Sequence, residues 1–409
     1  MLPMTDTNNR KIALNLATAW LGLLLSVMVV IGSTFSVFFE DIINEIDWTR
    51  GQVSKAFSLF LLSTVIGLPF IGYLVDRFGS RRVIIPCVMV FGLTLFTFKY
   101  FQSNLIYFYL IFIVIGLFAG GTSTLPYFKV ITRSFTRRRG LALGLANSGT
   151  GVGQFVLPYL AFLLISAYGW RDAYALIGLV VMFITIPLVH YCLNEKNQDQ
   201  HSNENVTAPD NEVGMELREA LQSRDFWLIG VAFFLGATTL LGYLIHMVPL
   251  LTDRGLSVQT AALAASAFGF SQLLGRLITG LLLDRFFAAY VIATMWLVSV
   301  LIFLLLWSGV DGYMLIICTA LLGFAWGGEG DVLAYMVSRY FGLRKFGSIY
   351  SLLLTMHMLG GVAGPWLMGN SFDAMGSYTL ILGGMAIIMS IAIVLILQMQ
   401  RYPKLSITN

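Results

Sequence analysis

Twelve long apolar runs constrain the fold of this chain more than any other feature. They form two sets of six on either side of a polar segment, at about 13–39, 54–75, 83–101, 105–132, 140–166, 172–193, 226–250, 259–283, 287–308, 312–338, 346–369 and 377–400. An apolar run of roughly 18 residues or more with few charges can cross a lipid bilayer as a helix. Only 11% of the residues are charged, whereas a soluble domain has about 25%. We therefore expect an all-α polytopic membrane protein with twelve transmembrane helices, surrounded by lipid and with no nucleic-acid partner.

The polar segment divides the chain into two halves. Residues 194–225 are crowded with Asn, Gln, Asp and Glu, which predicts a solvated cytoplasmic linker between an N-terminal half (1–193) and a C-terminal half (226–409). This linker is expected either to be mostly disordered or to form a short amphipathic helix near 214–221. The first apolar run is too long, and too polar at its start, for a cleaved signal peptide.

Lysines and arginines are distributed unequally between the loops. If both termini are cytoplasmic, five of the 25 basic residues lie on the outer side, Lys129 and Arg276 fall within apolar runs, and the remaining eighteen lie on the inner side. Basic residues favour the cytoplasmic side of a membrane. The distribution therefore predicts cytoplasmic termini, in a plasma (bacterial inner) membrane. Lys129, near the inner end of the fourth run, is expected to extend its ammonium group to the headgroups.

The two halves repeat each other. Residues 58–78 align with 266–286 at an offset of 208, with matching pairs Ser58/Ser266, Ser63/Ser271, Gly67/Gly275, Gly72/Gly280, Asp76/Asp284, Arg77/Arg285 and Phe78/Phe286. A second match, at an offset of 207, places 116–121 over 323–328. Two related six-helix halves with a site between them are typical of secondary transporters, because alternating access needs two matched halves.

One loop carries a family resemblance. The segment Gly72-Tyr-Leu-Val-Asp76-Arg77-Phe-Gly79-Ser-Arg81-Arg82 resembles the signature between the second and third helices of the major facilitator superfamily, and its degenerate copy begins at Gly280. Within that superfamily the chain is most similar to monocarboxylate transporters and oxalate/formate antiporters. The supporting segments are 37–43, 47–54, 138–144 and 338–344. The resemblance implies the superfamily fold, working as a single chain.

The resemblance also implies a conformational latch at this loop. A carboxylate at a helix C-terminus is disfavoured by the dipole of its own helix, so Asp76 should interact elsewhere. By resemblance, it meets an arginine and a helix N-terminus and holds the cytoplasmic side closed. The alternative is a loop that only fixes topology. The residues of the expected latch are Gly72, Asp76, Arg77, Gly79, Arg81, Arg82, Asp284 and Arg285.

Arg276 is the leading candidate for binding substrate. It lies within the eighth run, eight residues before Asp284, and its repeat partner is Leu68, so the repeat does not require a charge there. A charge within the membrane is costly and usually faces a cavity. A guanidinium group binds a carboxylate through two parallel hydrogen bonds, and in both resembling families an eighth-helix arginine binds the substrate carboxylate. The alternative is an arginine that extends to the inner headgroups.

Two acids in the tenth run are candidates for proton coupling. Glu329 and Asp331 occupy positions where the first half has Thr122 and Thr124. Residues two apart on a helix point about 200° apart, so one acid is expected to face the pathway and the other to pair with a neighbouring helix. Desolvation favours the protonated form of a carboxylic acid, as proton coupling requires. Glu329 is nearer the midplane, and the alternative is a purely structural pair.

Other polar residues within the runs are weaker candidates for binding substrate. His246 and His357 could bind an anion or transfer a proton, although a lone histidine in a helix is often just hydrogen-bonded. His357 resembles in position a substrate-binding lysine of oxalate antiporters. Tyr127 could supply a hydroxyl group. Gln272 lies one turn before Arg276, where animal monocarboxylate transporters have an aspartate.

The predicted function is secondary active transport of a small organic anion, expected to be a monocarboxylate, in symport with protons or in exchange. Because Ser33 and Gln272 replace the lysine and aspartate of the resembling family, its proton-coupling pair is missing. Export of a larger amphipathic compound is the alternative. Motifs of membrane enzymes and nucleotide-driven pumps are absent, and the three cysteines are too scattered for a metal site. We therefore expect no enzyme activity, cofactor or metal.

Overall fold

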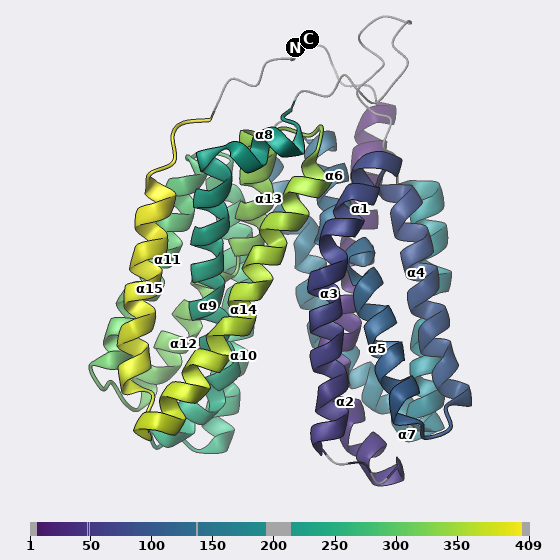
Figure 1. Ribbon diagram of the computed structural model, residues 1–409, viewed down its shortest axis with the longest axis horizontal. Coiled ribbons are helices and arrows are strands. Elements are labelled where there is room, and N and C mark those ends of the chain that lie inside the picture. Colours follow the sequence, from purple (N-terminus) through teal and green to yellow (C-terminus); the bar gives the residue numbers. More distant parts are fainter. Residues whose placement is uncertain (1–5, 47, 49, 136–137, 194–213, 403–409) are drawn as a thin grey trace, which may run out of the picture. The chain divides into compact units, whose positions relative to one another are not determined.

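The described part of the chain is almost entirely helical. The computed structural model describes residues 6–46, 48, 50–135, 138–193 and 214–402 (Figure 1). Its helices are α1 (Asp6–Leu24), α2 (Val27–Ile46), α3 (Arg50–Phe78), α4 (Ser80–Phe96), η1 (Thr97–Tyr100), α5 (Leu105–Ala119), η2 (Gly120–Thr122), α6 (Thr124–Ser134), α7 (Arg139–Cys192), α8 (Leu217–Gln222), α9 (Arg224–Asp253), α10 (Val258–Leu283), α11 (Ala288–Trp307), α12 (Tyr313–Trp326), α13 (Glu329–Tyr340), α14 (Phe346–Met375) and α15 (Thr379–Leu397).

Within the described residues, eleven helical segments are long and apolar enough to cross a membrane. One of them, α7, has 54 residues and contains Gly169, whose φ of 76° and ψ of 164° are not helical. At about 1.5 Å per residue, 54 helical residues would extend far beyond one bilayer. The break at Gly169 therefore divides α7 into two crossings, and the predicted all-α fold with twelve spans is confirmed.

The fourth and tenth spans are interrupted at equivalent places. Between α5 and α6 the chain forms the short 3₁₀ turn η2, and between α12 and α13 it turns at Gly327 and Gly328. The offset of 207 places these two breaks over one another. Interrupted membrane helices are common at the binding sites of transporters, because their free backbone groups can contact ligands.

The structure forms two compact units. The first contains 1–136, 145–212 and 343–352, and the second contains 137–144, 213–342 and 353–409. Each unit therefore includes the first turns of a helix, α14 or α7, whose remaining residues belong to the other unit. Most of the predicted linker, 194–213, lies outside the described residues. Its last part includes α8, near the short helix expected there.

Glycines bring the same pair of helices close together in each unit. In the first unit, where α3 packs along α5, a Cβ atom added to Gly67 would collide with the carbonyl oxygen of Leu117 (Figure 1). In the second unit, where α10 packs along α12, Gly275 has the same relation to the carbonyl oxygen of Phe324. The repeat read from the sequence thus reflects a shared backbone contact, at which no side chain fits.

Candidate functional site

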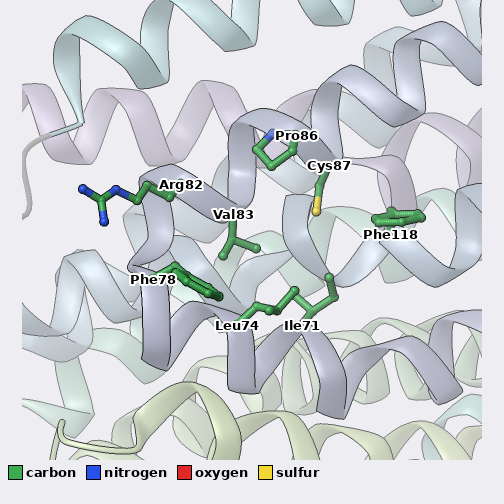
Figure 2. Close-up of a pocket in the computed structure, with 8 residues that line it drawn as sticks. All are labelled: Ile71, Leu74, Phe78, Arg82, Val83, Pro86, Cys87 and Phe118. Atoms are coloured by element: carbon green, nitrogen blue, oxygen red, sulfur yellow. The ribbon is translucent and has the colours of Figure 1, made fainter.

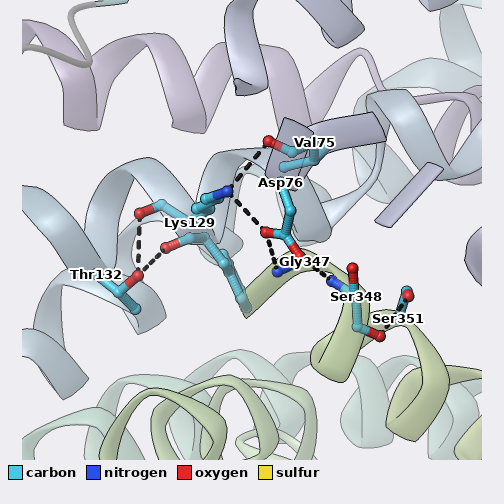
Figure 3. Close-up of polar contacts among 8 residues, drawn as sticks. Val75, Asp76, Lys129, Thr132, Gly347, Ser348 and Ser351 are labelled. Carbon is cyan, nitrogen blue, oxygen red and sulfur yellow. Dashed lines mark hydrogen bonds and ion pairs between the residues drawn. The ribbon is translucent and has the colours of Figure 1, made fainter. Parts of the chain in front are cut away.

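The first feature is a buried carboxylate bound to a helix N-terminus (Figure 3). Asp76, near the end of α3, accepts hydrogen bonds from the backbone N–H groups of Gly347 at 2.8 Å and Ser348 at 2.6 Å. Both donors lie in the first turn of α14, where N–H groups have no partner within the helix. This is also the positive end of the helix dipole, which stabilises a carboxylate.

Lys129 of α6 completes this cluster. Its Nζ atom lies 2.7 Å from Oδ1 of Asp76 and donates to the carbonyl oxygen of Val75 at 3.1 Å. The side chains of Lys129 and Asp76 are only 1% and 2% exposed. The prediction that Lys129 extends to the headgroups is wrong, because a buried carboxylate and a carbonyl group lie within its reach. The cation beside Asp76 is thus a lysine, where the resemblance implied an arginine.

The second unit repeats this arrangement without the lysine. Asp284, which follows α10, accepts hydrogen bonds from the N–H groups of Gly140 at 2.8 Å and Leu141 at 3.1 Å, in the first turn of α7. Gly140 and Gly347 are 207 residues apart, so the donors repeat as well as the acceptors. The position equivalent to Lys129 is Met336, which is buried.

A close backbone contact accompanies each carboxylate. A Cβ atom added to Gly72 would collide with the carbonyl oxygen of Gly347, and one added to Gly347 would lie 2.6 Å from the carbonyl oxygen of Gly72. In the second unit, a Cβ atom on Gly280 would lie 2.8 Å from the carbonyl oxygen of Gly140. Gly72 of the expected latch and its repeat partner Gly280 therefore sit where helix backbones touch.

The loop arginines of the expected latch lie at or near the surface. Arg77 is exposed and donates to the hydroxyl group of Tyr73 at 3.1 Å, while Arg81 contacts Nδ1 of His190 at 3.1 Å. Gly79 has a φ of 85°, which favours glycine. Arg285 is exposed.

A pocket of about 340 Å³ lies between α3, α4 and α5 (Figure 2). Among the described residues, those that line it are the charged Arg82 and seven uncharged residues: Ile71, Leu74, Phe78, Val83, Pro86, Cys87 and Phe118. None of the predicted substrate-binding residues contributes to this pocket.

Arg276 and Asp331 form a buried pair in the second unit. Nε of Arg276 donates to the carbonyl oxygen of Gly327 at 3.1 Å and lies 3.8 Å from Oδ2 of Asp331. The two side chains are 13% and 0% exposed. The structure thus brings the predicted substrate-binding arginine together with one of the two predicted coupling acids, at the break between α12 and α13.

The first unit provides an internal comparison for this pair. At the positions of Arg276, Gly327 and Asp331 it has Leu68, Gly120 and Thr124. The glycine is retained, while the arginine is a buried leucine and the aspartate is a threonine whose hydroxyl lies 3.3 Å from that of Tyr350. Since the same helix crossing forms without the charges, the fold does not require Arg276 and Asp331.

Glu329 points in a different direction from Asp331. It is 1% exposed, and both carboxylate oxygens lack a hydrogen-bond partner of normal geometry within the described part of the chain. The indole groups of Trp296 and Trp326 are the donors beside it. Gly236 of α9 faces it so closely that an added Cβ atom would lie 2.6 Å from Oε1. The expected divergence of the two acids is therefore seen in their neighbours.

The two histidines differ in how their ring nitrogens are used. Nε2 of His246 lies 3.1 Å from the carbonyl oxygen of Pro365, so it carries the proton, and Nδ1 accepts from the hydroxyl of Tyr378 at 3.0 Å. His246 is thus fully hydrogen-bonded inside the second unit. His357 donates through Nδ1 to the carbonyl oxygen of Phe233 at 3.4 Å.

The last two candidates occupy contrasting environments. Tyr127 is fully buried, and its hydroxyl group packs against Gly22, where an added Cβ atom would collide with it. In this conformation Tyr127 contributes to packing. Gln272 is half-buried on α10, one turn from Arg276.

Comparisons with known proteins identify the family. The family model described as Major Facilitator Superfamily matches residues 19–263 and 227–408. The chain belongs to this superfamily. The Major Facilitator Superfamily consists of transporters rather than enzymes, as the loop signature predicted. The fucose:proton symporter of E. coli has the same fold, with a TM-score of 0.73 at 15% identity over 95% of this chain and 98% of that chain.

Two of three distant relatives are named for a small organic anion. The chain is 23% identical to the uncharacterised MFS-type transporter YhjX of Escherichia coli, over 88% of each chain. It is 27% identical to monocarboxylate transporter 13 of Bos taurus, over 85% of this chain and 80% of that protein. It is also 26% identical to the probable sulfoacetate transporter SauU of Cupriavidus necator, over 60% of this chain and 59% of that protein.

Sequence reasoning missed several parts of these sites. It did not predict the pairing of Lys129 with Asp76, the backbone donors in the first turns of α7 and α14, or the position of Gly236 and Trp296 beside Glu329. The glycines at the two helix starts were detectable, because Gly140 and Gly347 obey the repeat offset of 207. The partners of Glu329 carry no such signal, since they depend on the packing of three helices.

Proposed function

We propose that this secondary transporter carries a small organic anion, most simply a monocarboxylate, by alternating access of its two six-helix halves (1–193 and 226–409). The observation that carries the proposal is the buried Arg276–Asp331 pair, at a place where the repeat has two uncharged residues. The names of the distant relatives support it, since monocarboxylates and sulfoacetate are both small organic anions.

Arg276 would bind the substrate through its permanently charged guanidinium group. Without substrate, Asp331 neutralises that charge from 3.8 Å. An arriving carboxylate or sulfonate competes with the aspartate for the guanidinium group, because that group can pair with either anion. Asp331 therefore acts as a competitor for Arg276 rather than as a permanent structural partner.

The two carboxylate clusters would act as conformational latches. Asp76 and Asp284 each hold a helix N-terminus through two backbone hydrogen bonds, which can break without covalent change when the halves move. We propose that both latches lie at the cytoplasmic side, with cytoplasmic termini in a bacterial inner membrane, and that a single chain is sufficient for transport.

The proposal is tested by uptake into proteoliposomes. A panel of labelled monocarboxylates and short sulfonates is offered to the wild type, Arg276→Gln and Arg218→Gln. The last is a matched control, because Arg218 is exposed on α8. Uptake of at least one anion that is lost in Arg276→Gln and retained in Arg218→Gln is the expected result.

Two outcomes would contradict the proposal. Normal uptake by Arg276→Gln would remove this residue from the site. Absence of anion uptake by the wild type, together with export of a larger amphipathic compound, would replace the proposed substrate class with the alternative.

A further inference from the structure

Glu329 is an acid that the scaffold does not need. Its repeat partner Thr122 is buried at the equivalent helix break, where Oγ1 accepts from the N–H group of Val27 at 3.1 Å and donates to the carbonyl oxygen of Ala119 at 3.1 Å. That hydroxyl therefore helps to join α2 to the break between α5 and α6. Glu329 makes no comparable hydrogen bond within the described residues. Where the first half has the hydrogen-bonded threonine, the second half has the longer, ionisable glutamate.

The packing around Glu329 leaves room for its carboxyl group and little else. Gly236 supplies no side chain at the point where Oε1 approaches, and a Cβ atom there would also lie 2.9 Å from Cζ2 of Trp296. Trp296 is fully buried and Glu329 is 1% exposed. An ionised carboxylate in such a place, with indole N–H groups as its donors and no cation beside it among the described residues, is costly, whereas the neutral acid is tolerated.

The charged groups of the surrounding helices are engaged elsewhere. Asp331, two residues along α13, lies beside Arg276 of α10. On α14, His357 contacts α9 through the Phe233 carbonyl, and the Phe233 ring lies 5.3 Å from that of Trp296. The groups that face Glu329 itself, from α9, α11 and α12, are Gly236, Trp296 and Trp326, which are not charged.

We infer that Glu329 is the proton-binding site of this transporter, and that Gly236 and the two tryptophans form its pocket. The two acids of α13 then have separate tasks: Asp331 neutralises Arg276, while Glu329 takes up one proton and releases it when a conformational change brings water to its carboxyl group. The coupling part of this inference rests on the proposed anion transport, whereas proton binding by Glu329 does not.

The proton-binding test uses the purified full chain without substrate. Infrared difference spectra between acid and alkaline pH separate the absorption of a protonated carboxylic acid from that of a carboxylate. The wild type is expected to show an acid band that disappears on alkalinisation and is absent from Glu329→Gln. Gln has the shape of the protonated acid, so this variant is expected to fold.

Two glycine variants examine the pocket. Gly236→Ala places a methyl group within 2.6 Å of Oε1 and is expected to shift the band, whereas Gly330→Ala, with nothing within 4 Å of its added Cβ, should leave it unchanged. The assignment would be overturned if the wild type showed no such band, or if the band persisted in Glu329→Gln. It would also be overturned if the band were lost in His357→Gln but not in Glu329→Gln.

Transport then tests coupling. With a proton gradient imposed, Glu329→Gln is expected to lose accumulation of the anion above equilibrium while still exchanging internal for external anion. Accumulation equal to that of the wild type would overturn the coupling role. If the wild type transports no anion but its infrared band depends on Glu329, the proposed substrate fails and the proton site stands.

Discussion

Replacing Lys129 with methionine gives the first carboxylate cluster the residue, Met336, that the second has at the equivalent position. In Lys129→Met, Asp76 keeps the N–H groups of Gly347 and Ser348 but loses an ammonium group at 2.7 Å. Breaking a buried ion pair by removing one partner costs about 3–5 kcal/mol. Because the two backbone donors remain, as they do at Asp284, we expect a loss near the lower limit, about 3 kcal/mol.

This loss of unfolding free energy corresponds to a lower melting temperature. In a unit of roughly 200 residues, 1 kcal/mol shifts the midpoint by about 2–4 °C, so Lys129→Met should melt about 6–12 °C below the wild type. Thermal unfolding of the detergent-purified chain, followed by circular dichroism at one fixed scan rate, measures the difference. Asp76→Asn should lose more, because it weakens the contact with the α14 N-terminus and leaves the lysine without its carboxylate.

Lys99→Met is the matched control. Lys99 pairs with Asp172 at 3.3 Å, but the two side chains are 50% and 46% exposed. An exposed pair contributes about 0–1 kcal/mol, so its loss should move the midpoint by less than about 4 °C. If Lys129→Met melts no lower than Lys99→Met, the buried pair does not stabilise the first unit and the reasoning above is wrong.

Three further predictions concern packing, hydrogen bonding and orientation. Gly280→Ala places a methyl group 2.8 Å from the carbonyl oxygen of Gly140, and this overpacking should cost about 1–3 kcal/mol and lower the melting midpoint. Gly269→Ala is the control: its added Cβ has no atom within 4 Å, so its melting midpoint should stay unchanged. His246→Gln should lower the midpoint but leave the KM for the transported anion unchanged, because both ring nitrogens bond within the second unit; a changed KM would return His246 to the site. A membrane-impermeant maleimide should label Cys192, the only one of the three cysteines that is not buried, in inside-out but not right-side-out vesicles; the reverse pattern would invert the proposed orientation.

The fold was predictable because its signals are local. Each span is a continuous apolar run, and the repeat offset connects two copies of one helix pair without any knowledge of contacts. Gly67 and Gly275 were matched from the sequence alone, and both mark the same close helix crossing. Even the break at Gly169, which the hydropathy profile placed as a loop, follows from a conformation that glycine adopts readily.

The site was predictable only in part, because its partners come from distant segments. The cost of charge in a membrane singled out Arg276, Glu329 and Asp331, but not which acid would pair with the arginine. Helix geometry supplied one constraint, the angle of about 200° between residues two apart. Lys129 was assigned to the headgroups because its partner Asp76 lies 53 residues away, and a sequence pattern does not show that α6 and the end of α3 meet.

The first turns of α14 belong to the first unit, and the first turns of α7 belong to the second. This arrangement has a consequence for synthesis on the ribosome. When residues 1–193 have been made, Asp76 and Lys129 are both present, but the α14 donors at Gly347 and Ser348 do not yet exist. The lysine can neutralise the aspartate during this interval. Asp284 appears after Gly140 and Leu141 have been made, so both of its backbone donors are present at once. We therefore expect a nascent chain stalled before residue 343 to be degraded faster when Lys129 is methionine, and pulse-chase labelling of such a truncated chain measures that rate.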